Sequence, residues 1–100
     1  MKRAEVVVLP TALEHVRRID DWWQRERLHS PGLFLEEFAA ALQRLATAPS
    51  AGTIYTRSHR ADLRRLLLPR TRHHVYYVVE SERVAVMAVW HAARGVGPRL

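Results

Sequence analysis

The chain has 100 residues, 48% of them hydrophobic, and it contains no cysteine. A chain of this length builds one core, so we expect a single domain over residues 1–100, and the apolar content excludes wholesale disorder. The absence of thiols excludes disulfides, thiolate zinc sites and cysteine nucleophiles. No apolar run approaches the roughly 18–20 residues of a membrane span, and the run at 6–9 is too short for a signal-peptide core, which predicts a cytoplasmic protein.

The net charge of +6 is distributed unevenly along the chain. Residues 1–56 hold seven basic and seven acidic side chains, whereas residues 57–100 hold nine arginines and three acids. A basic half joined to a neutral half predicts a polyanionic or acidic partner. Fifteen of the 16 cations are arginine, which suits bidentate contacts with phosphate or carboxylate, although a GC-rich genome produces the same bias.

The chain is predicted to begin with a strand followed by a helix. Residues 5–9 are mostly β-branched and apolar and end at Pro10, which is typical of a short buried strand. Thr11 and Glu14 have the spacing of a capping box, which predicts a helix start at that point. Apolar residues then recur every three or four positions as far as about residue 28. This stripe consists of Leu13, Val16, Ile19 and Trp23.

A second helix is predicted from Ser30 as N-cap and Pro31 in the first turn to Ala48, just before Pro49. Its apolar face is formed by Phe34, Phe38, Ala41, Leu42 and Leu45. Because so few residues separate the two helices, they must pack as an antiparallel hairpin.

After residue 50 the pattern changes to that of strands. Residues 53–60 have no clean period and are interpreted as a loop or frayed strand, whereas 63–68, 74–79 and 84–90 are strand-length aliphatic runs with short separators. Such linkers favour antiparallel hairpins, so these runs should form a meander. The sequence therefore predicts a two-layer α+β domain, in which the elements follow one another along the chain as β-α-α-β-β-β. An antiparallel sheet packs on a helical hairpin.

One set of sequence features extends over about residues 4–94. The features are Ala12–Val16 and Trp22-Trp23, Phe38, Leu42, Leu45 and Pro49-x-x-Gly52, Leu63–Leu68, His74–Val79, Val84–Val86, and Val89-Trp90-His91 with Arg94. Together they resemble the RelE/ParE superfamily of bacterial toxins from type II toxin–antitoxin modules. The tyrosine strand and the His-x-x-Arg ending of the last strand are closest to the ParE branch.

The resemblance implies one of two activities. RelE-like members are ribosome-dependent mRNA interferases, whereas ParE-like members inhibit DNA gyrase and are not known as nucleases. In both branches a cognate antitoxin neutralises the toxin through a C-terminal segment that folds on its surface. We expect a ParE-like gyrase inhibitor that needs no cofactor. The alternatives are an endoribonuclease of the RelE type and a non-toxic remnant that binds RNA or antitoxin.

The candidate catalytic residues, should the chain cleave RNA, are Arg65, His91 and Arg94. Alternation along the strand places Arg65 on the sheet face opposite Leu66 and Leu68, where its cation could hold a phosphate; the alternative is a solvated surface arginine. The His91 imidazole suits proton transfer near neutral pH, and Arg94 follows it closely; alternatively, His91 binds a neighbouring backbone group at the end of the sheet. Six histidines without cysteine do not predict a metal site.

Further residues are candidates for contact with nucleic acid or a protein partner. Four arginines flank the strands, and their alternative role is solubility. One of the two adjacent tryptophans should be exposed and suited to an interface. Tyrosines 76 and 77 point to opposite faces, so at most one should be core, and the other could stack on a base. These candidates are Arg57, Arg60, Arg70, Arg72, Trp22 and Tyr77.

Two departures from the RelE pattern weaken the nuclease interpretation. RelE-type nucleases crowd lysines and arginines on the sheet face and often carry a tyrosine after the last strand. Here the only lysine is Lys2, and residues 95–100 contain no tyrosine. No general base other than His91 is evident from the sequence.

Overall fold

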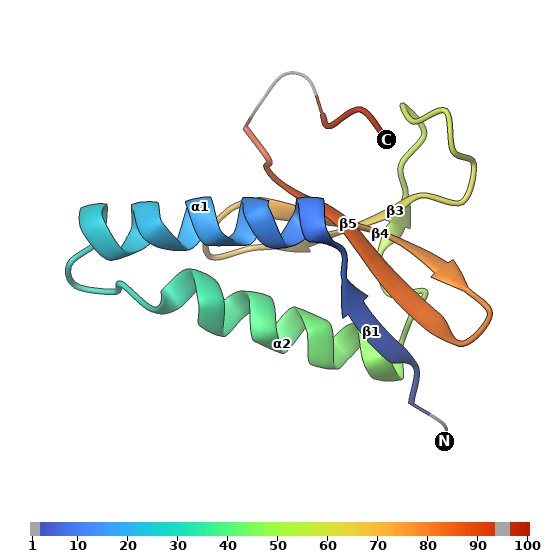
Figure 1. Ribbon diagram of the computed structural model, residues 1–100, viewed down its shortest axis with the longest axis horizontal. Coiled ribbons are helices and arrows are strands. Elements are labelled where there is room, and N and C mark those ends of the chain that lie inside the picture. Colours follow the sequence, from blue (N-terminus) through green and yellow to red (C-terminus); the bar gives the residue numbers. More distant parts are fainter. Residues whose placement is uncertain (1–2, 94–96) are drawn as a thin grey trace.

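A computed structural model describes residues 3–93 and 97–100 and confirms the two-layer α+β architecture. A helical hairpin covers one face of a five-stranded sheet, and its far end projects beyond the sheet (Figure 1). Neither helix of the described residues is long and apolar enough to cross a membrane. The elements are β1 (Glu5–Val8), α1 (Pro10–Glu26), α2 (Leu33–Thr47), β2 (Thr53–Ile54), β3 (Arg64–Leu68), β4 (His73–Glu80) and β5 (Arg83–His91).

The sheet has the strand order β1-β5-β4-β3-β2. Strands β3, β4 and β5 form the predicted antiparallel meander. The predicted antiparallel sheet is extended at one edge by β1, which pairs in parallel with β5, with Val8 opposite Val86, so the sheet is mixed. Short turns reveal only hairpin neighbours, and β1 is far from β5 in the sequence. At the other edge of the sheet, residues 53–60 were expected to form a loop or a frayed strand. Thr53 and Ile54 form the short strand β2, which pairs with β3.

Both helices start differently from the prediction. Helix α1 begins at Pro10 with Leu9 as N-cap and no capping side chain, so the capping box at Thr11 does not form. Proline suits the first helical position because its φ is already fixed and its missing N–H would have no helical acceptor. Helix α2 begins at Leu33 after Gly32, because residues 30–33 form a turn in which the Ser30 carbonyl accepts from the Leu33 N–H at 3.2 Å.

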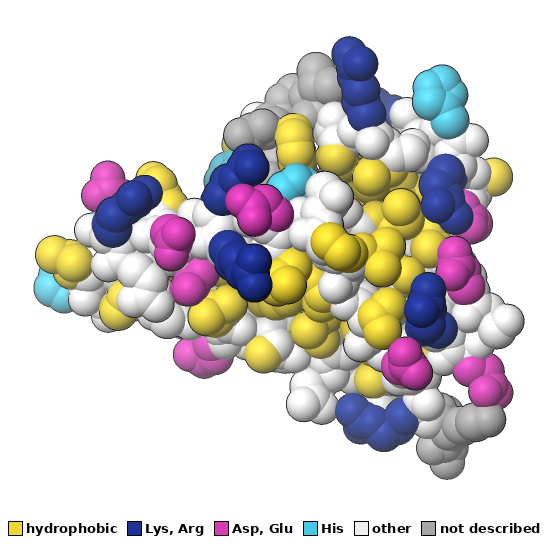
Figure 2. All heavy atoms as spheres, viewed as in Figure 1, with side chains coloured by type: hydrophobic (Ala, Val, Ile, Leu, Met, Phe, Trp, Pro, Cys, Tyr) yellow, Lys and Arg dark blue, Asp and Glu magenta, His cyan; other side chains and the backbone are white. Residues whose placement is uncertain are grey.

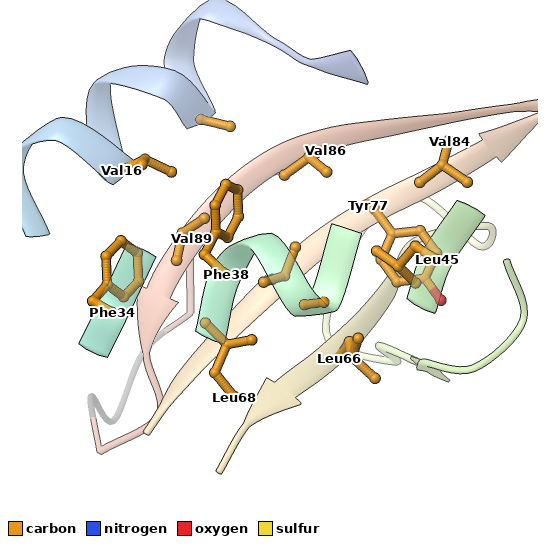
Figure 3. Packing of buried hydrophobic residues seen from close by; sticks show 13 residues of the cluster. Val16, Phe34, Phe38, Leu45, Leu66, Leu68, Tyr77, Val84, Val86 and Val89 are labelled. Atoms are coloured by element: carbon orange, nitrogen blue, oxygen red, sulfur yellow. The ribbon is translucent and has the colours of Figure 1, made fainter. Parts of the chain in front are cut away.

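The main core lies between the hairpin and the sheet (Figure 3). Leu66 and Leu68 of β3 point into it, as the alternation predicts. In α1, Ala12 is fully buried, whereas Leu13 of the predicted stripe remains 38% exposed. The other large contributors are Val16, Phe34, Phe38, Leu45, Val75, Tyr77, Val84, Val86 and Val89.

A second, smaller cluster covers the opposite face of the sheet. Tyr55 and Leu63, which flank the loop between β2 and β3, pack there with Tyr76 and Val78. The expectation that at most one of the adjacent tyrosines is core is therefore wrong: Tyr76 and Tyr77 are exposed by 2% and 0%, on opposite faces. The loop supplies a cover that strand periodicity could not reveal.

Candidate functional site

A polar hollow of about 320 Å³ opens on the sheet face that the helices leave uncovered. Strands β3, β4 and β5 supply its basic and aromatic side chains, and residues 53–57 form one wall. The residues that define it here are Tyr55, Arg57, Arg65, His74, Tyr76 and His91. Two predicted catalytic residues, Arg65 and His91, thus meet in one hollow; Arg94 lies outside the described residues.

Arg65 is held by aromatic side chains. Its guanidinium carbon lies 4.9 Å from the centre of the Tyr55 ring, and Nη1 donates to the Tyr76 hydroxyl at 3.5 Å. The alternation of β3 places Arg65 on the side opposite Leu66, as expected. A guanidinium stacked on a ring keeps N–H groups available at its edge, so Arg65 can bind an anion without losing this support.

His74 is a member of the hollow that was not among the candidates named from the sequence. It lies two residues before Tyr76 on β4, and the two ring centres are 6.0 Å apart. Burial lowers the pKa of His74 below its usual 6.5, and the cations of Arg65 and Arg72 lower it further. At neutral pH its imidazole is therefore uncharged and able to accept a proton. The i, i+2 spacing with Tyr76 was the signal that could have found it.

His91 ends β5 at the rim of the hollow. Its Nδ1 accepts a hydrogen bond from the Ala93 N–H at 3.1 Å, and its ring meets that of His73 edge-on with centres 5.0 Å apart. The backbone contact that was the alternative to catalysis therefore exists. It leaves Nε2 of the ring for other contacts, so it does not exclude proton transfer.

Together these groups could bind a phosphate and exchange a proton with it. Arg65 and Arg57 supply the cations, His74 a neutral base, and Tyr76 a hydroxyl. Among residues 3–93 and 97–100, no three histidine, aspartate or glutamate side chains gather as a metal site would require.

A second hollow, of about 640 Å³, lies between the end of α1 and the turn that joins β3 to β4. We call it the tryptophan–arginine hollow, and it is defined by Arg18, Ile19, Trp22, Trp23, Arg27, Arg70 and Arg72, with Thr71, His73 and His91 completing its lining. Three predicted partner-binding residues, Trp22, Arg70 and Arg72, meet here. His91 lines both hollows.

The β3–β4 turn in this hollow is fixed by a carboxylate of α2. Glu37 accepts from the backbone N–H groups of Arg70 at 2.7 Å and Thr71 at 2.9 Å, and from the Thr71 hydroxyl at 2.7 Å. Burial alone would raise the pKa of Glu37, but the hydrogen bonds from Thr71 and Arg70 outweigh it and hold the pKa below 4.5. The backbone of Arg70 and Thr71 is therefore tied to helix α2.

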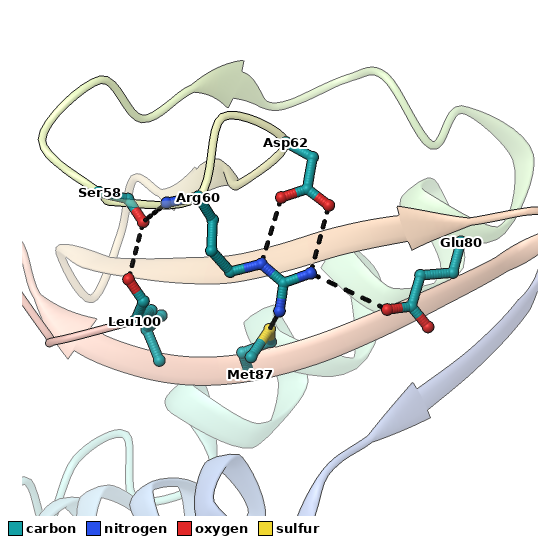
Figure 4. Close-up of polar contacts among 6 residues, drawn as sticks. All are labelled: Ser58, Arg60, Asp62, Glu80, Met87 and Leu100. Carbon is teal, nitrogen blue, oxygen red and sulfur yellow. Dashed lines mark hydrogen bonds and ion pairs between the residues drawn. The ribbon is translucent and has the colours of Figure 1, made fainter.

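Two residues that were predicted to contact a partner, Arg60 and Tyr77, instead make contacts within the chain. Arg60 pairs with Asp62 at 3.2 Å and Glu80 at 4.0 Å and donates to the Met87 sulfur at 3.7 Å, which ties the β2–β3 loop to the sheet (Figure 4). Tyr77 is fully buried, so its predicted contact with a base or partner is wrong; its hydroxyl instead donates to the Pro49 carbonyl at 2.7 Å and accepts from the Gly52 N–H at 2.8 Å.

The arginines of residues 57–100 do not form one basic face. Arg57 and Arg65 line the polar hollow, Arg70 and Arg72 line the tryptophan–arginine hollow, and Arg83 pairs with Glu80 at 3.5 Å. Basic and acidic side chains are interspersed on the face that Figure 2 shows. The segregation of charge in the sequence thus becomes two separate cationic hollows, one of which also recruits Arg18 and Arg27 from the neutral half.

The fold and the family model agree on the class of protein. The structure resembles the chromosomal ParDE TA system from P. aeruginosa, with a TM-score of 0.69 and 15% identity over 89% of this chain and 96% of that chain. It also resembles the YoeB dimer from Staphylococcus aureus, with a TM-score of 0.60 and 12% identity over 89% and 97%. No curated protein sequence matches the chain. These likenesses show that the chain has the same fold as these two structures.

The particular family follows from the sequence model. Residues 6–96 match the model of the ParE toxin of type II toxin–antitoxin systems, parDE. The chain belongs to this ParE toxin family, which confirms the resemblance seen in its sequence, and membership implies a cognate antitoxin partner.

Proposed function

We propose that the chain acts in the cytoplasm as a ParE-like toxin that inhibits DNA gyrase by binding, and that a cognate antitoxin neutralises it. The ParE family match over residues 6–96 carries the proposal. The geometry supports a binding role, because two tyrosines hold the Arg65 guanidinium in place while N–H groups at its edge stay available to an anion. A cationic hollow of this kind suits an acidic protein surface or DNA phosphates.

A cell-based labelling experiment tests the target. Expression of the chain should stop incorporation of labelled thymidine first, because blocked gyrase arrests replication, with labelled methionine incorporation falling later. Co-expression of the product of the adjoining reading frame should restore both. If protein synthesis stops first while replication continues, the ribosome is the target and the gyrase proposal is wrong.

A second function, mRNA cleavage on the ribosome, is favoured by one specific observation. The polar hollow gathers Arg65, His74, His91 and the Tyr76 hydroxyl, and the lowered pKa of His74 makes it a neutral base. In that reaction His74 would take the proton of the 2′-hydroxyl as its oxygen attacks the adjacent phosphorus. Arg65 would stabilise the phosphorane, and His91 would protonate the departing 5′-oxygen.

Paired variants separate the two functions. The His74→Gln and His91→Gln substitutions keep hydrogen-bonding capacity but remove proton transfer, which typically contributes 10²–10⁴-fold to a rate. Under the gyrase proposal both variants should arrest growth like the wild type. Under the nuclease alternative toxicity should fall by about 10²-fold or more, with loss of the mRNA cuts that primer extension maps.

A further inference from the structure

Strand β4 is flanked at both ends by a residue with left-handed backbone. Arg72, just before the strand, has a φ of 64°, and Ser81, just after it, has a φ of 56°. In the described part of the chain these are the two residues other than glycine with a positive φ. Glycine adopts this conformation freely, whereas a residue with a Cβ atom meets steric repulsion there. Both positions therefore carry backbone strain that glycine would relieve.

Backbone contacts hold Arg72 in this conformation. Its N–H donates to the Leu68 carbonyl at 2.8 Å, which closes the turn between β3 and β4. Its carbonyl accepts from the Ala92 N–H at 2.8 Å, which ties the turn to the end of β5. The residues on either side, Thr71 and His73, are only 4% and 6% exposed. Because these contacts use the backbone of residue 72 and the side chains of its neighbours, the fold would form them equally well with glycine at this position.

The Arg72 side chain, by contrast, has no polar partner of its own. It is exposed, and within residues 3–93 and 97–100 it makes no hydrogen bond and no ion pair with a carboxylate. It lines the tryptophan–arginine hollow, and its charge also acts on His74 of the polar hollow. A guanidinium with its donors unused, at the border of two candidate binding surfaces, is suited to an anionic group of another molecule.

From this contrast between backbone and side chain we infer that Arg72 is a target-binding residue of the chain. Its guanidinium contacts an anionic group of the target, and the cation occupies a position at which the backbone alone favours glycine. The inference rests on the proposed function, which supplies gyrase as the target. It has a distinctive consequence: one substitution should make the chain more stable and, at the same time, a weaker inhibitor.

Variants of the full chain test this consequence by thermal unfolding and by inhibition of gyrase supercoiling. Arg72→Gly should raise Tm by about 2–5 °C, because the strain is relieved. It should also raise the concentration that half-inhibits supercoiling at least about tenfold, as expected when a central arginine contact is removed. Since the variant is more stable than the wild type, its loss of inhibition cannot come from unfolding.

Two further substitutions separate the cation from the flexibility of glycine. Asparagine tolerates left-handed backbone, so Arg72→Asn should also raise Tm and weaken inhibition. Arg72→Lys keeps both the strain and the charge, so its Tm should stay near that of the wild type and it should inhibit better than Arg72→Asn.

Ser81→Gly is the matched control, because it relieves the same kind of strain at the opposite end of β4 and lies outside both hollows. It should raise Tm in the same way and change inhibition less than about twofold. The inference is overturned if Arg72→Gly inhibits as well as the wild type, if its Tm does not rise, or if Ser81→Gly loses inhibition to the same extent.

Growth arrest by the same variants separates this inference from the gyrase proposal. If the wild type leaves supercoiling unaffected but arrests growth, the gyrase proposal fails. Loss of the arrest in Arg72→Gly but not in Ser81→Gly would then still support Arg72 as a target-binding residue, whereas equal arrest by both variants would overturn it. A wild type that neither inhibits gyrase nor arrests growth overturns both proposals.

Discussion

The two faces of the sheet are built by different means. The face under α1 and α2 is closed by aliphatic and phenylalanine side chains that recur at helix and strand periods. The opposite face is closed by a loop, with Tyr55 and Tyr76 supporting Arg65 at the edge of the polar hollow. The face under the helices therefore holds the larger core and the opposite face holds the groups of the polar hollow, so substitutions on the two faces should have different consequences.

The largest expected loss of stability comes from a core substitution on the face of the sheet that the helices cover. Phe34 is fully buried and stacks on Phe38 with ring centres 5.9 Å apart. Phe34→Ala should lower the free energy of unfolding by about 3–5 kcal/mol, because it leaves a cavity in the core. The control is Leu35→Ala, which removes a 40% exposed side chain next to it and should cost less than about 1 kcal/mol. Denaturant unfolding measures both, and equal losses would contradict the assignment of the larger core to this face.

A pH-dependent loss of stability should come from His73, which lies at the end of the same face of the sheet. His73 is 6% exposed, and its Nδ1 is a buried polar atom without a hydrogen-bond partner in the described residues. Burial, together with the neighbouring His91, lowers the pKa of His73 to about 4. The unfolded chain therefore takes up a proton near pH 6.5, where the folded chain does not. Stability is fully present above pH 6.5 and is lost as the pH falls toward 4.

The lost free energy should be about 3 kcal/mol between pH 6.5 and 4. The His73→Leu variant has no group to titrate at this position, so the difference between wild type and variant isolates the contribution from the carboxylates that titrate nearby. Urea unfolding at half-unit pH steps measures it. Parallel pH profiles for the two proteins would show that His73 does not carry the effect.

A smaller effect on stability is expected from the two adjacent tyrosines, which lie on opposite faces of the sheet. The Tyr77 hydroxyl, under the helices, joins the Pro49 carbonyl to the Gly52 N–H, whereas the Tyr76 hydroxyl accepts only a long bond from Arg65. Tyr77→Phe should lower the free energy of unfolding by about 1–3 kcal/mol, because it leaves two backbone groups without their hydrogen-bond partner. Tyr76→Phe should lower it by less than about 1 kcal/mol. Chemical denaturation measures both, and a larger loss from Tyr76→Phe would reverse the proposed difference between the faces.

The smallest effect concerns electrostatics in the polar hollow. Arg65 contributes to the lowered pKa of His74, so Arg65→Met should raise that pKa toward 6.5. Arg57→Met is the control, because Arg57 also lines the hollow but is not among the groups that shift His74. NMR titration of the His74 ring protons measures both. An unchanged pKa in Arg65→Met would mean that Arg65 does not contribute to the shift.

The sequence predicted the helix-covered face better than the other. Apolar periods are local, and they located both helices and four strands to within a few residues. The parallel pairing of β1 with β5, and the burial of Tyr76 beneath Tyr55, depend on segments distant in the chain. Local alternation cannot reveal such contacts, which is why Tyr77 was expected at a partner surface.

The same limit explains the candidate site. Strand alternation placed Arg65 correctly, and the end of β5 placed His91 near it. His74 was missed although it lies in the predicted strand 74–79, because its place two residues before Tyr76 on the same face was not used. The tryptophan–arginine hollow was only partly foreseen, because it joins α1 to a turn more than 40 residues later, and the uneven charge along the sequence gave no hint that Arg18 and Arg27 would join Arg70 and Arg72.

The most direct test of the central claim uses purified components. The chain is incubated with gyrase, ATP and relaxed circular plasmid, and the DNA is resolved after protein denaturation. Inhibition of gyrase by binding predicts that supercoiling stops and linear plasmid accumulates in proportion to the added chain. Uninhibited supercoiling at a concentration of the chain at which ribosome-bound mRNA is cut would contradict the account and identify the chain as an RNA-cleaving toxin.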